Sequence, residues 1–68
     1  MITTDIWFAS FLRLRGFHLK NYIVLSRGKG SFEFSITDDV WKMMKLEFDS
    51  SEISKVKHLQ ASLKDLLY

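Results

Sequence analysis

The chain has 68 residues, a formal net charge of +2 and no cysteine. A chain of this length is expected to form one domain, residues 1–68, and without cysteine it has neither a disulfide framework nor a cysteine-based zinc site. Its content of 47% hydrophobic and 15% aromatic residues excludes disorder, and the small net charge alone gives no reason to expect nucleic-acid binding.

The stretch "TTDIWFASFLRLRG" predicts a first helix. Thr3 or Thr4 is expected to cap its N-terminus through the hydroxyl group, and Asp5 then lies in the first turn, where the helix dipole favours negative charge. Gly16 follows a basic last turn and marks the C-terminal end, where a left-handed residue is usual. The apolar stripe of this helix comprises Trp7, Phe8, Phe11, Leu12 and Leu14.

Alternating apolar residues in "YIVLSRGKGSFEFSI" predict a β-hairpin. We expect a two-residue loop at Gly28-Lys29, with the glycine at the first central position of a type II′ turn, where a positive φ is required. This loop pairs Leu25 with Phe32. Ile23 then faces Phe34, which places the four apolar side chains on one face of the hairpin.

The stretch "TDDVWKMMKLEF" predicts a second helix. Thr37 is a good N-cap, and Asp38-Asp39 lies in the first turn, where it complements the helix dipole. Helix capping therefore explains this acidic pair without a role in acid–base catalysis. The apolar face of the helix comprises Val40, Trp41, Met44 and Phe48.

Residues 49–68 predict a third helix. Asp49 or Ser50 is expected to cap it, and Glu52 stands at capping-box spacing from Asp49. Its stripe comprises Val56, Leu59, Leu63, Leu66 and Leu67, with Ile53 at the edge. The element order α-β-β-α-α predicts an α+β fold in which the helices pack on one face of the hairpin.

The residues indicate no catalytic, cofactor-binding or metal site. "RGKGS" leads into a strand, so it lacks the context and spacing of a phosphate-binding loop. The same stretch lacks two aromatic positions of the strand motif in RNA-recognition domains. His18 and His58 are the only histidines, too few for a metal site without further ligands. We therefore predict that the protein is not an enzyme and binds no cofactor.

Basic residues are concentrated in the first half of the chain. Residues 1–31 carry five basic residues and one acidic residue, a charge of +4, whereas residues 32–68 carry five basic and seven acidic residues, a charge of −2. This asymmetry suggests an alternative function, nucleic-acid binding through contacts with phosphate groups. The candidate contact residues are Arg13, Arg15, Lys20, Arg27 and Lys29.

The predicted elements leave apolar surface without a partner. Ile6 and Trp7 exceed what one core face of the first helix needs, and a two-stranded sheet has unprotected edges. We therefore expect a two-fold homodimer with Ile6, Trp7 or a hairpin edge in the interface. A host or phage protein is the second candidate partner.

Eleven positions follow the pattern T-D, A-x-F-L, G-F, a glycine-bearing hairpin ending in F-x-F, and a late L-K. They are Thr4, Asp5, Ala9, Phe11, Leu12, Gly16, Phe17, Phe32, Phe34, Leu63 and Lys64. In this pattern the chain resembles, over most of its length, a family of small bacterial and bacteriophage domains of unknown function. The resemblance implies an origin in a phage or mobile element and supplies no activity. The aromatic pair Trp7-Phe8 departs from the pattern.

From these features we expect a small non-enzymatic accessory or binding protein that acts through protein–protein contacts. The longest uncharged run, Ile6–Leu12, is far shorter than the roughly 20 residues of a membrane-spanning helix. The N-terminal residues do not resemble a signal peptide. The expected location is therefore the cytoplasm of a bacterial or infected host cell, with no membrane partner.

Overall fold

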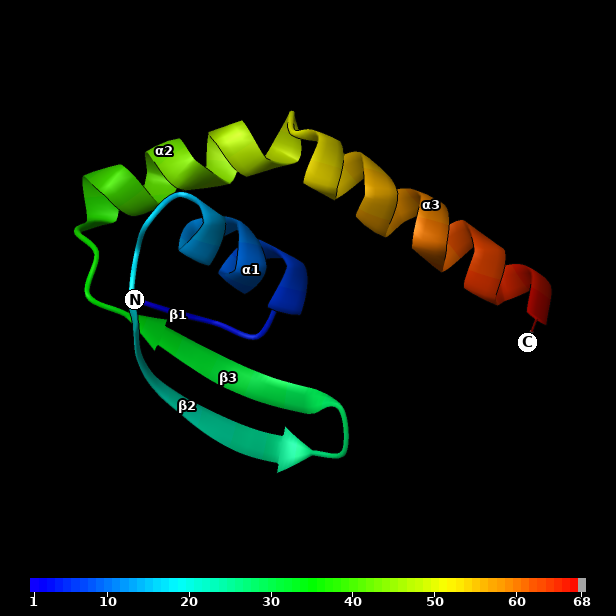
Figure 1. Ribbon diagram of the computed structural model, residues 1–68, viewed down its shortest axis with the longest axis horizontal. Coiled ribbons are helices and arrows are strands. Elements are labelled where there is room, and N and C mark those ends of the chain that lie inside the picture. Colours follow the sequence, from blue (N-terminus) through cyan, green and yellow to red (C-terminus); the bar gives the residue numbers. More distant parts are fainter. Residues whose placement is uncertain (68) are drawn as a thin grey trace.

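The elements follow the predicted order, with one short strand added. The computed structural model describes residues 1–67, so Tyr68, the last residue of the predicted third helix, lies outside the described residues. The elements are β1 (Ile2–Thr3), α1 (Ile6–Leu14), β2 (Leu19–Ser26), β3 (Lys29–Phe34), α2 (Asp38–Asp49) and α3 (Glu52–Leu67). The predicted α+β fold, a helix followed by a hairpin and two helices, is confirmed (Figure 1).

The sheet is antiparallel and has the strand order β1-β3-β2, with β3 in the centre. β1 places Ile2 opposite Glu33, and the N-terminal ammonium group of Met1 donates a hydrogen bond to the carbonyl oxygen of Phe34 at 3.0 Å. The expectation of a two-stranded sheet was therefore wrong. Two residues are too few to show an alternating pattern, and β1 protects part of the β3 edge that the hairpin alone would leave open.

The hairpin register differs from the predicted one. Ser26 faces Lys29, so the two loop residues are Arg27 and Gly28, and only Gly28 has a positive φ, of 76°. Tyr22 therefore faces Phe32, and an irregularity between Val24 and Ser26 shifts the pairing. As a result, Ile23 and Leu25 are 59% and 61% exposed instead of packing with Phe32 and Phe34. The run Tyr-Ile-Val-Leu is apolar on both faces, so the pattern does not fix the register.

The core forms around α1, which lies between the sheet and α2 (Figure 1). Phe8 and Leu12 of α1 and Phe34 of β3 are fully buried, and α2 adds Met44 and Phe48. The ring of Phe8 meets the edge of Trp41 with 5.0 Å between centroids, a favourable T-shaped geometry. The predicted apolar faces of the first two helices are confirmed except for Leu14, which is 72% exposed.

The ends of α1 are fixed by hydrogen bonds. Asp5, and not Thr3 or Thr4, is the N-cap: its carboxylate accepts hydrogen bonds from the backbone N–H groups of Trp7 at 2.9 Å and Phe8 at 3.3 Å. Thr3 instead accepts a hydrogen bond from the backbone N–H of Asp5. At the other end Gly16 has φ 95°, and the N–H of Phe17 donates to the carbonyl of Leu12, which completes a Schellman motif.

The caps of α2 and α3 agree only partly with expectation. Thr37 caps α2 as predicted and accepts a hydrogen bond from the N–H of Val40. α3 is capped by Ser51, because its hydroxyl oxygen accepts a hydrogen bond from the N–H of Ser54 at 3.2 Å. The predicted caps Asp49 and Ser50 were wrong because α2 continues through Asp49.

Candidate interaction surface

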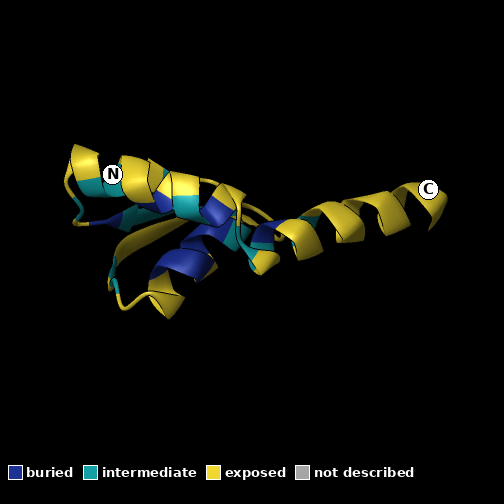
Figure 2. Cartoon of the chain, turned by 90° about the horizontal axis from the view of Figure 1, so that it is seen from above, coloured by how far each residue is buried: buried dark blue, intermediate teal, exposed yellow. Residues whose placement is uncertain are grey.

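α3 presents a row of exposed apolar side chains, here called the α3 stripe. It comprises Val56, Leu59, Leu63 and Leu66, which are 51%, 66%, 62% and 81% exposed. Their spacing of three, four and three residues places them along one side of the helix. The predicted stripe therefore exists, but the expectation that it packs on the hairpin was wrong. Within residues 1–67, Ser54 is the only buried residue of this helix (Figure 2).

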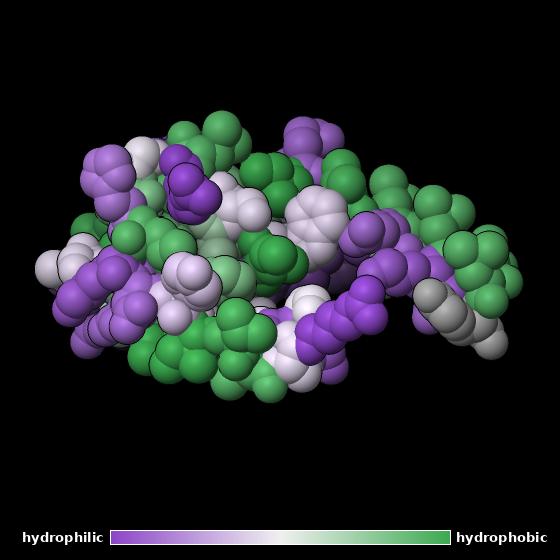
Figure 3. Space-filling view, turned by 60° about the horizontal axis from the view of Figure 1, so that its bottom comes forward, coloured by the Kyte–Doolittle hydropathy of each residue, from purple (hydrophilic) through white to green (hydrophobic). Residues whose placement is uncertain are grey.

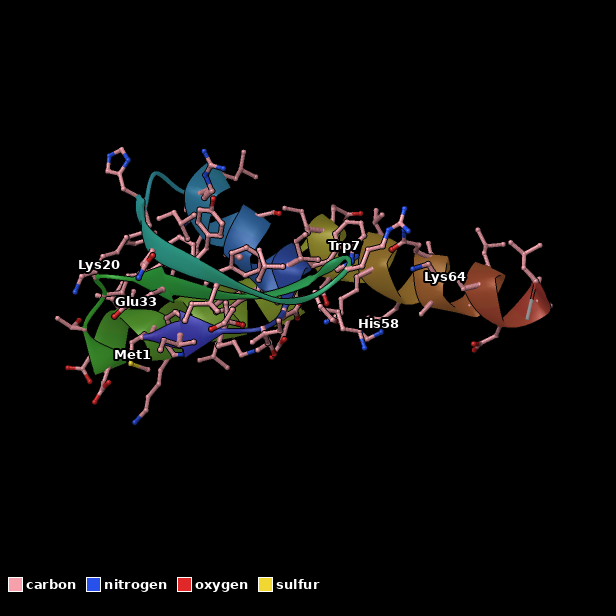
Figure 4. All side chains as sticks on the ribbon, turned by 90° about the horizontal axis from the view of Figure 1, so that it is seen from below. Met1, Trp7, Lys20, Glu33, His58 and Lys64 are labelled. Atoms are coloured by element: carbon pink, nitrogen blue, oxygen red, sulfur yellow. The ribbon has the colours of Figure 1, made fainter. Side chains whose placement is uncertain are left out.

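α3 is held to the rest of the molecule near its N-terminal end. Ile53 packs against the core, and Ser54 is buried. Lys57 makes the next contact, a hydrogen bond and ion pair with Asp5 at 2.5 Å, and its ammonium group lies 5.9 Å from the centre of the Phe48 ring. From His58 onward the described side chains are exposed, and the helix extends past the hairpin tip (Figures 1 and 4).

Asp5 has a perturbed ionisation equilibrium because of these contacts. Partial burial raises the pKa of Asp5, but the hydrogen bond from Lys57 and those from the backbone of Phe8 and Trp7 outweigh that effect and lower the pKa below its ordinary value. Asp5 is thus ionised at neutral pH and serves both α1 and α3. Its role is structural.

A second apolar surface lies where α1 begins, on the face of the hairpin that turns towards that helix. An open pocket of about 280 Å³, here called the hairpin pocket, occupies it. The residues that line it include Thr4, Ile6, Tyr22, Ile23, Val24, Gly30 and Phe32. Ile6 and Val24 are 57% and 71% exposed. Figure 3 shows hydrophobic patches on the side of the molecule that carries the hairpin and at the outer end of α3.

The residues predicted for a dimer interface lie at different depths. Ile6 is exposed and borders the hairpin pocket, whereas Trp7 is half-buried and packs against the core. The α3 stripe is a longer exposed row than Ile6 and Trp7, although its period predicts packing on the hairpin. Its three-four spacing is also that of a helix–helix interface, and a short chain offers few positions for a further apolar face to pack against. These two features together are what indicates an exposed stripe.

The five predicted nucleic-acid contacts do not form one patch. Arg15 lies 2.7 Å from Glu47, whose facing oxygen accepts no hydrogen bond, so the contact is an ion pair only. Lys20 lies 3.9 Å from Glu33, at the end of the sheet remote from α3 (Figure 4). Arg27 and Lys29 are at the hairpin tip. The eight residues of β2, which span about 26 Å, run from the end of the sheet near Lys20 to this tip. Arg13 is exposed in the last turn of α1.

The remaining candidate groups do not assemble into a site within residues 1–67. In this range no three His, Cys, Asp or Glu side chains lie close enough together to hold a metal ion. His18 precedes β2, whereas His58 lies on α3. Asp38 and Asp39 occupy the first turn of α2, where the helix dipole explains them.

The surface area is large for the mass of the chain. Folded monomers of 8.0 kDa expose about 4,500 Å², whereas this chain exposes 5461 Å², an excess of about 1,000 Å². The radius of gyration, 12.9 Å, likewise exceeds the roughly 11 Å expected for 68 residues. The projecting α3 accounts for both differences.

Comparison with models of protein families, with curated protein sequences and with solved structures found no match to this chain. The resemblance to small bacterial and phage domains therefore stays a prediction. Among the helices of the described residues, none has both the length and the apolar character needed to cross a lipid bilayer.

Proposed function

We propose that the protein is a small non-enzymatic binding protein that acts through protein–protein contacts made by the α3 stripe. The supporting observation is that all four stripe side chains are more than half exposed on a helix with one buried residue among those described. Apolar surface left in water costs about 25 cal/mol per Å², and a partner that covers the stripe recovers this free energy. Most of the stability of a helix in a protein comes from packing of its amphipathic face, and a partner would supply that packing to the outer part of this 16-residue helix.

The resemblance supports a narrower proposal. On that ground we propose an accessory protein of a phage or mobile element that works in the cytoplasm of the bacterial or infected cell. Cell fractionation tests the location: the protein should appear in the cytosolic fraction, and recovery with membranes would contradict this. Nucleic-acid binding stays a prediction. The five basic side chains are divided between the end of α1, the start of β2 and the hairpin tip, and two of them face acidic partners.

Site-specific photo-crosslinking in the native host cell tests the binding function. A photoreactive phenylalanine analogue at Leu63 should crosslink to a protein, since Leu63 lies in the α3 stripe. The matched control is the same analogue at Ala61, which is exposed on the same helix but lies about 200° around its axis from Leu63. Crosslinks from Leu63 alone support the proposal, whereas equal crosslinking from both positions, or none from either, contradicts it.

A further inference from the structure

We propose that the outer edge of β2 pairs with the outer edge of β2 in a second copy of this chain, in the antiparallel direction, so that the two three-stranded sheets join into one about a two-fold axis. This inference goes beyond the proposed function, because it uses a surface other than the α3 stripe. It also narrows the predicted dimer interface to one edge of the hairpin.

β2 forms the long open edge of the sheet. It has eight residues and lies at one side of the strand order β1-β3-β2, whereas the strand at the opposite side, β1, has two. An edge strand leaves a row of backbone N–H and C=O groups without ladder partners, and natural proteins commonly protect such edges with charged residues or proline. Residues 21–26 contain neither. Four of these six side chains are apolar and more than half exposed: Tyr22, Ile23, Val24 and Leu25.

One backbone group shows which residues of β2 face the open edge. The N–H of Tyr22 donates a hydrogen bond to the side-chain oxygen of its neighbour Asn21 at 2.8 Å, so it does not belong to the ladder with β3. Opposite residues in an antiparallel ladder alternate between hydrogen-bonded and non-hydrogen-bonded pairs. The pairing with β3 is regular from Asn21 to Val24, so the N–H and C=O of Val24 point to the same edge as those of Tyr22.

A second copy supplies a strand that fits this edge. Antiparallel pairing centred on Ile23 places Tyr22 opposite Val24 of the second copy, and each such pair exchanges two hydrogen bonds. Lys20 then lies opposite Ser26 and meets no like charge. The four apolar side chains, at roughly 100 Å² each, contribute about 400 Å² per copy. That area is typical of weak, reversible complexes, and the ladder hydrogen bonds add to it.

The pairing closes after two copies. Within residues 1–67 the other edge of the sheet is β1, and its two residues are too few to continue the ladder into a fibre. Tyr22 and Val24 line the hairpin pocket, so the two pockets meet across the axis and each gains a wall from the other copy. The hairpin tips point in opposite directions, so the two α3 helices project from opposite ends and leave both α3 stripes uncovered (Figure 1).

The first test measures mass and dimer affinity by analytical ultracentrifugation. The wild-type chain should sediment at twice 8.0 kDa and dissociate on dilution. Ile23→Lys should weaken dimerisation by about tenfold or more, because two like charges then face each other at the axis. The matched control is Ile2→Lys on β1, since Ile2 is 61% exposed and Ile23 is 59% exposed. It lies two strands from the interface and should change the affinity by less than about threefold.

Circular dichroism verifies that both variants remain folded. A wild-type chain that stays near 8.0 kDa at every concentration would overturn the dimer. Equal weakening by Ile23→Lys and Ile2→Lys would overturn the β2 edge as its interface.

The register is tested by mixing variants of opposite charge. Because Ile23 faces Ile23 of the second copy, Ile23→Lys mixed with Ile23→Glu should form a heterodimer about tenfold or more tighter than either variant alone. A heterodimer that is no tighter would overturn the register centred on Ile23.

The direction is tested by disulfide formation, since the chain has no cysteine of its own. Opposite residues in a hydrogen-bonded pair have Cα atoms about 5.5 Å apart, which suits a disulfide. When Tyr22→Cys and Val24→Cys variants are mixed and mildly oxidised, the 22–24 product should dominate. Dominant 22–22 and 24–24 products would overturn the antiparallel arrangement.

Two further variants separate the edge from its surroundings. Asn21→Ala frees the N–H of Tyr22 for the second copy and should tighten the dimer by about threefold or more, whereas a weaker dimer would contradict the assignment of this N–H to the interface. Leu59→Lys with Leu63→Lys charges the α3 stripe and should change the affinity by less than about threefold. Loss of the dimer in that variant would instead place the interface on α3.

Discussion

The ammonium group of Lys57 lies 2.5 Å from the carboxylate of Asp5, 52 positions earlier in the chain. The other oxygen of that carboxylate accepts the hydrogen bonds that cap α1. One side chain therefore begins the first helix and anchors the third. Together with the packing of Ile53 and the burial of Ser54, this contact fixes the direction in which α3 leaves the molecule.

Substitutions of Asp5 separate its two roles. Asp5→Ala removes the cap and the ion pair and should lower the free energy of unfolding by about 1–2 kcal/mol, the usual effect of losing an N-cap. Asp5→Asn should cost less, because asparagine also caps helices well but cannot pair with Lys57 as an anion. Urea denaturation measures both values. Equal losses for the two variants would show that the cap contributes little.

Lys57→Met is the matched change on α3. It retains the apolar stem beside Phe48 and removes only the charge. We expect Lys57→Met and Asp5→Asn to have similar effects, and the double variant to cost less than their sum, because both remove the same contact. Strict additivity would indicate that Asp5 and Lys57 do not interact in solution.

Acid should destabilise the protein through the same carboxylate. The pKa of Asp5 is lower in the folded chain than in the unfolded chain, so the unfolded state binds more protons between the two values. The stabilisation is therefore fully present above the unfolded pKa of about 3.9 and is lost as the pH falls through the folded value. Thermal unfolding between pH 7 and pH 2 should show this loss, and Asp5→Asn should reduce it. An unchanged pH profile in Asp5→Asn would assign the acid sensitivity to other groups.

The sequence is a good guide where an element has one buried face. In α2, Thr37 caps the helix and Met44 and Phe48 are buried as predicted, since polar residues separate the apolar positions. In β3, strict alternation correctly predicted a strand with Phe34 inside. A helix or strand with such a pattern has a single apolar face. The free energy of burying that face therefore favours one orientation of the element against the core.

The sequence is a poor guide where it holds more apolar residues than the core can bury. β2 carries Tyr22, Ile23, Val24 and Leu25 in succession, so either register buries apolar groups and the irregularity between Val24 and Ser26 decides the outcome. The α3 stripe has the period of a core-facing helix, and period alone does not identify what the face packs against. The contact between Asp5 and Lys57 joins residues 52 positions apart, which no local pattern reveals.

The loop glycine should matter for its backbone conformation and not for space. Gly28 has φ 76°, and a Cβ added there meets no heavy atom within 4 Å. Gly28→Ala should therefore lower the free energy of unfolding by about 1–2 kcal/mol, the cost of a left-handed conformation for an ordinary residue. Gly28→Asn should cost less, since asparagine adopts this conformation more readily. Chemical denaturation of both variants provides the measurement, and an Asn variant less stable than the Ala variant would contradict the explanation.

Titration with nucleic acid checks the alternative function. Arg27 and Lys29 at the hairpin tip are separated from the other basic candidates by the length of β2, so few phosphate groups can be contacted at once. We expect duplex and single-stranded DNA and RNA to bind no more tightly than about 100 μM at physiological salt, the weak end of non-specific binding. The logarithm of any affinity should fall against the logarithm of salt concentration with a slope no steeper than about −1.8, the value for two neutralised phosphates.

Arg27→Ala with Lys29→Ala should abolish what binding there is, whereas Lys20→Ala should not, because Lys20 faces Glu33. Micromolar binding with a slope near −4 or steeper would require all five basic residues to act together and would favour the nucleic-acid function over the protein-binding one.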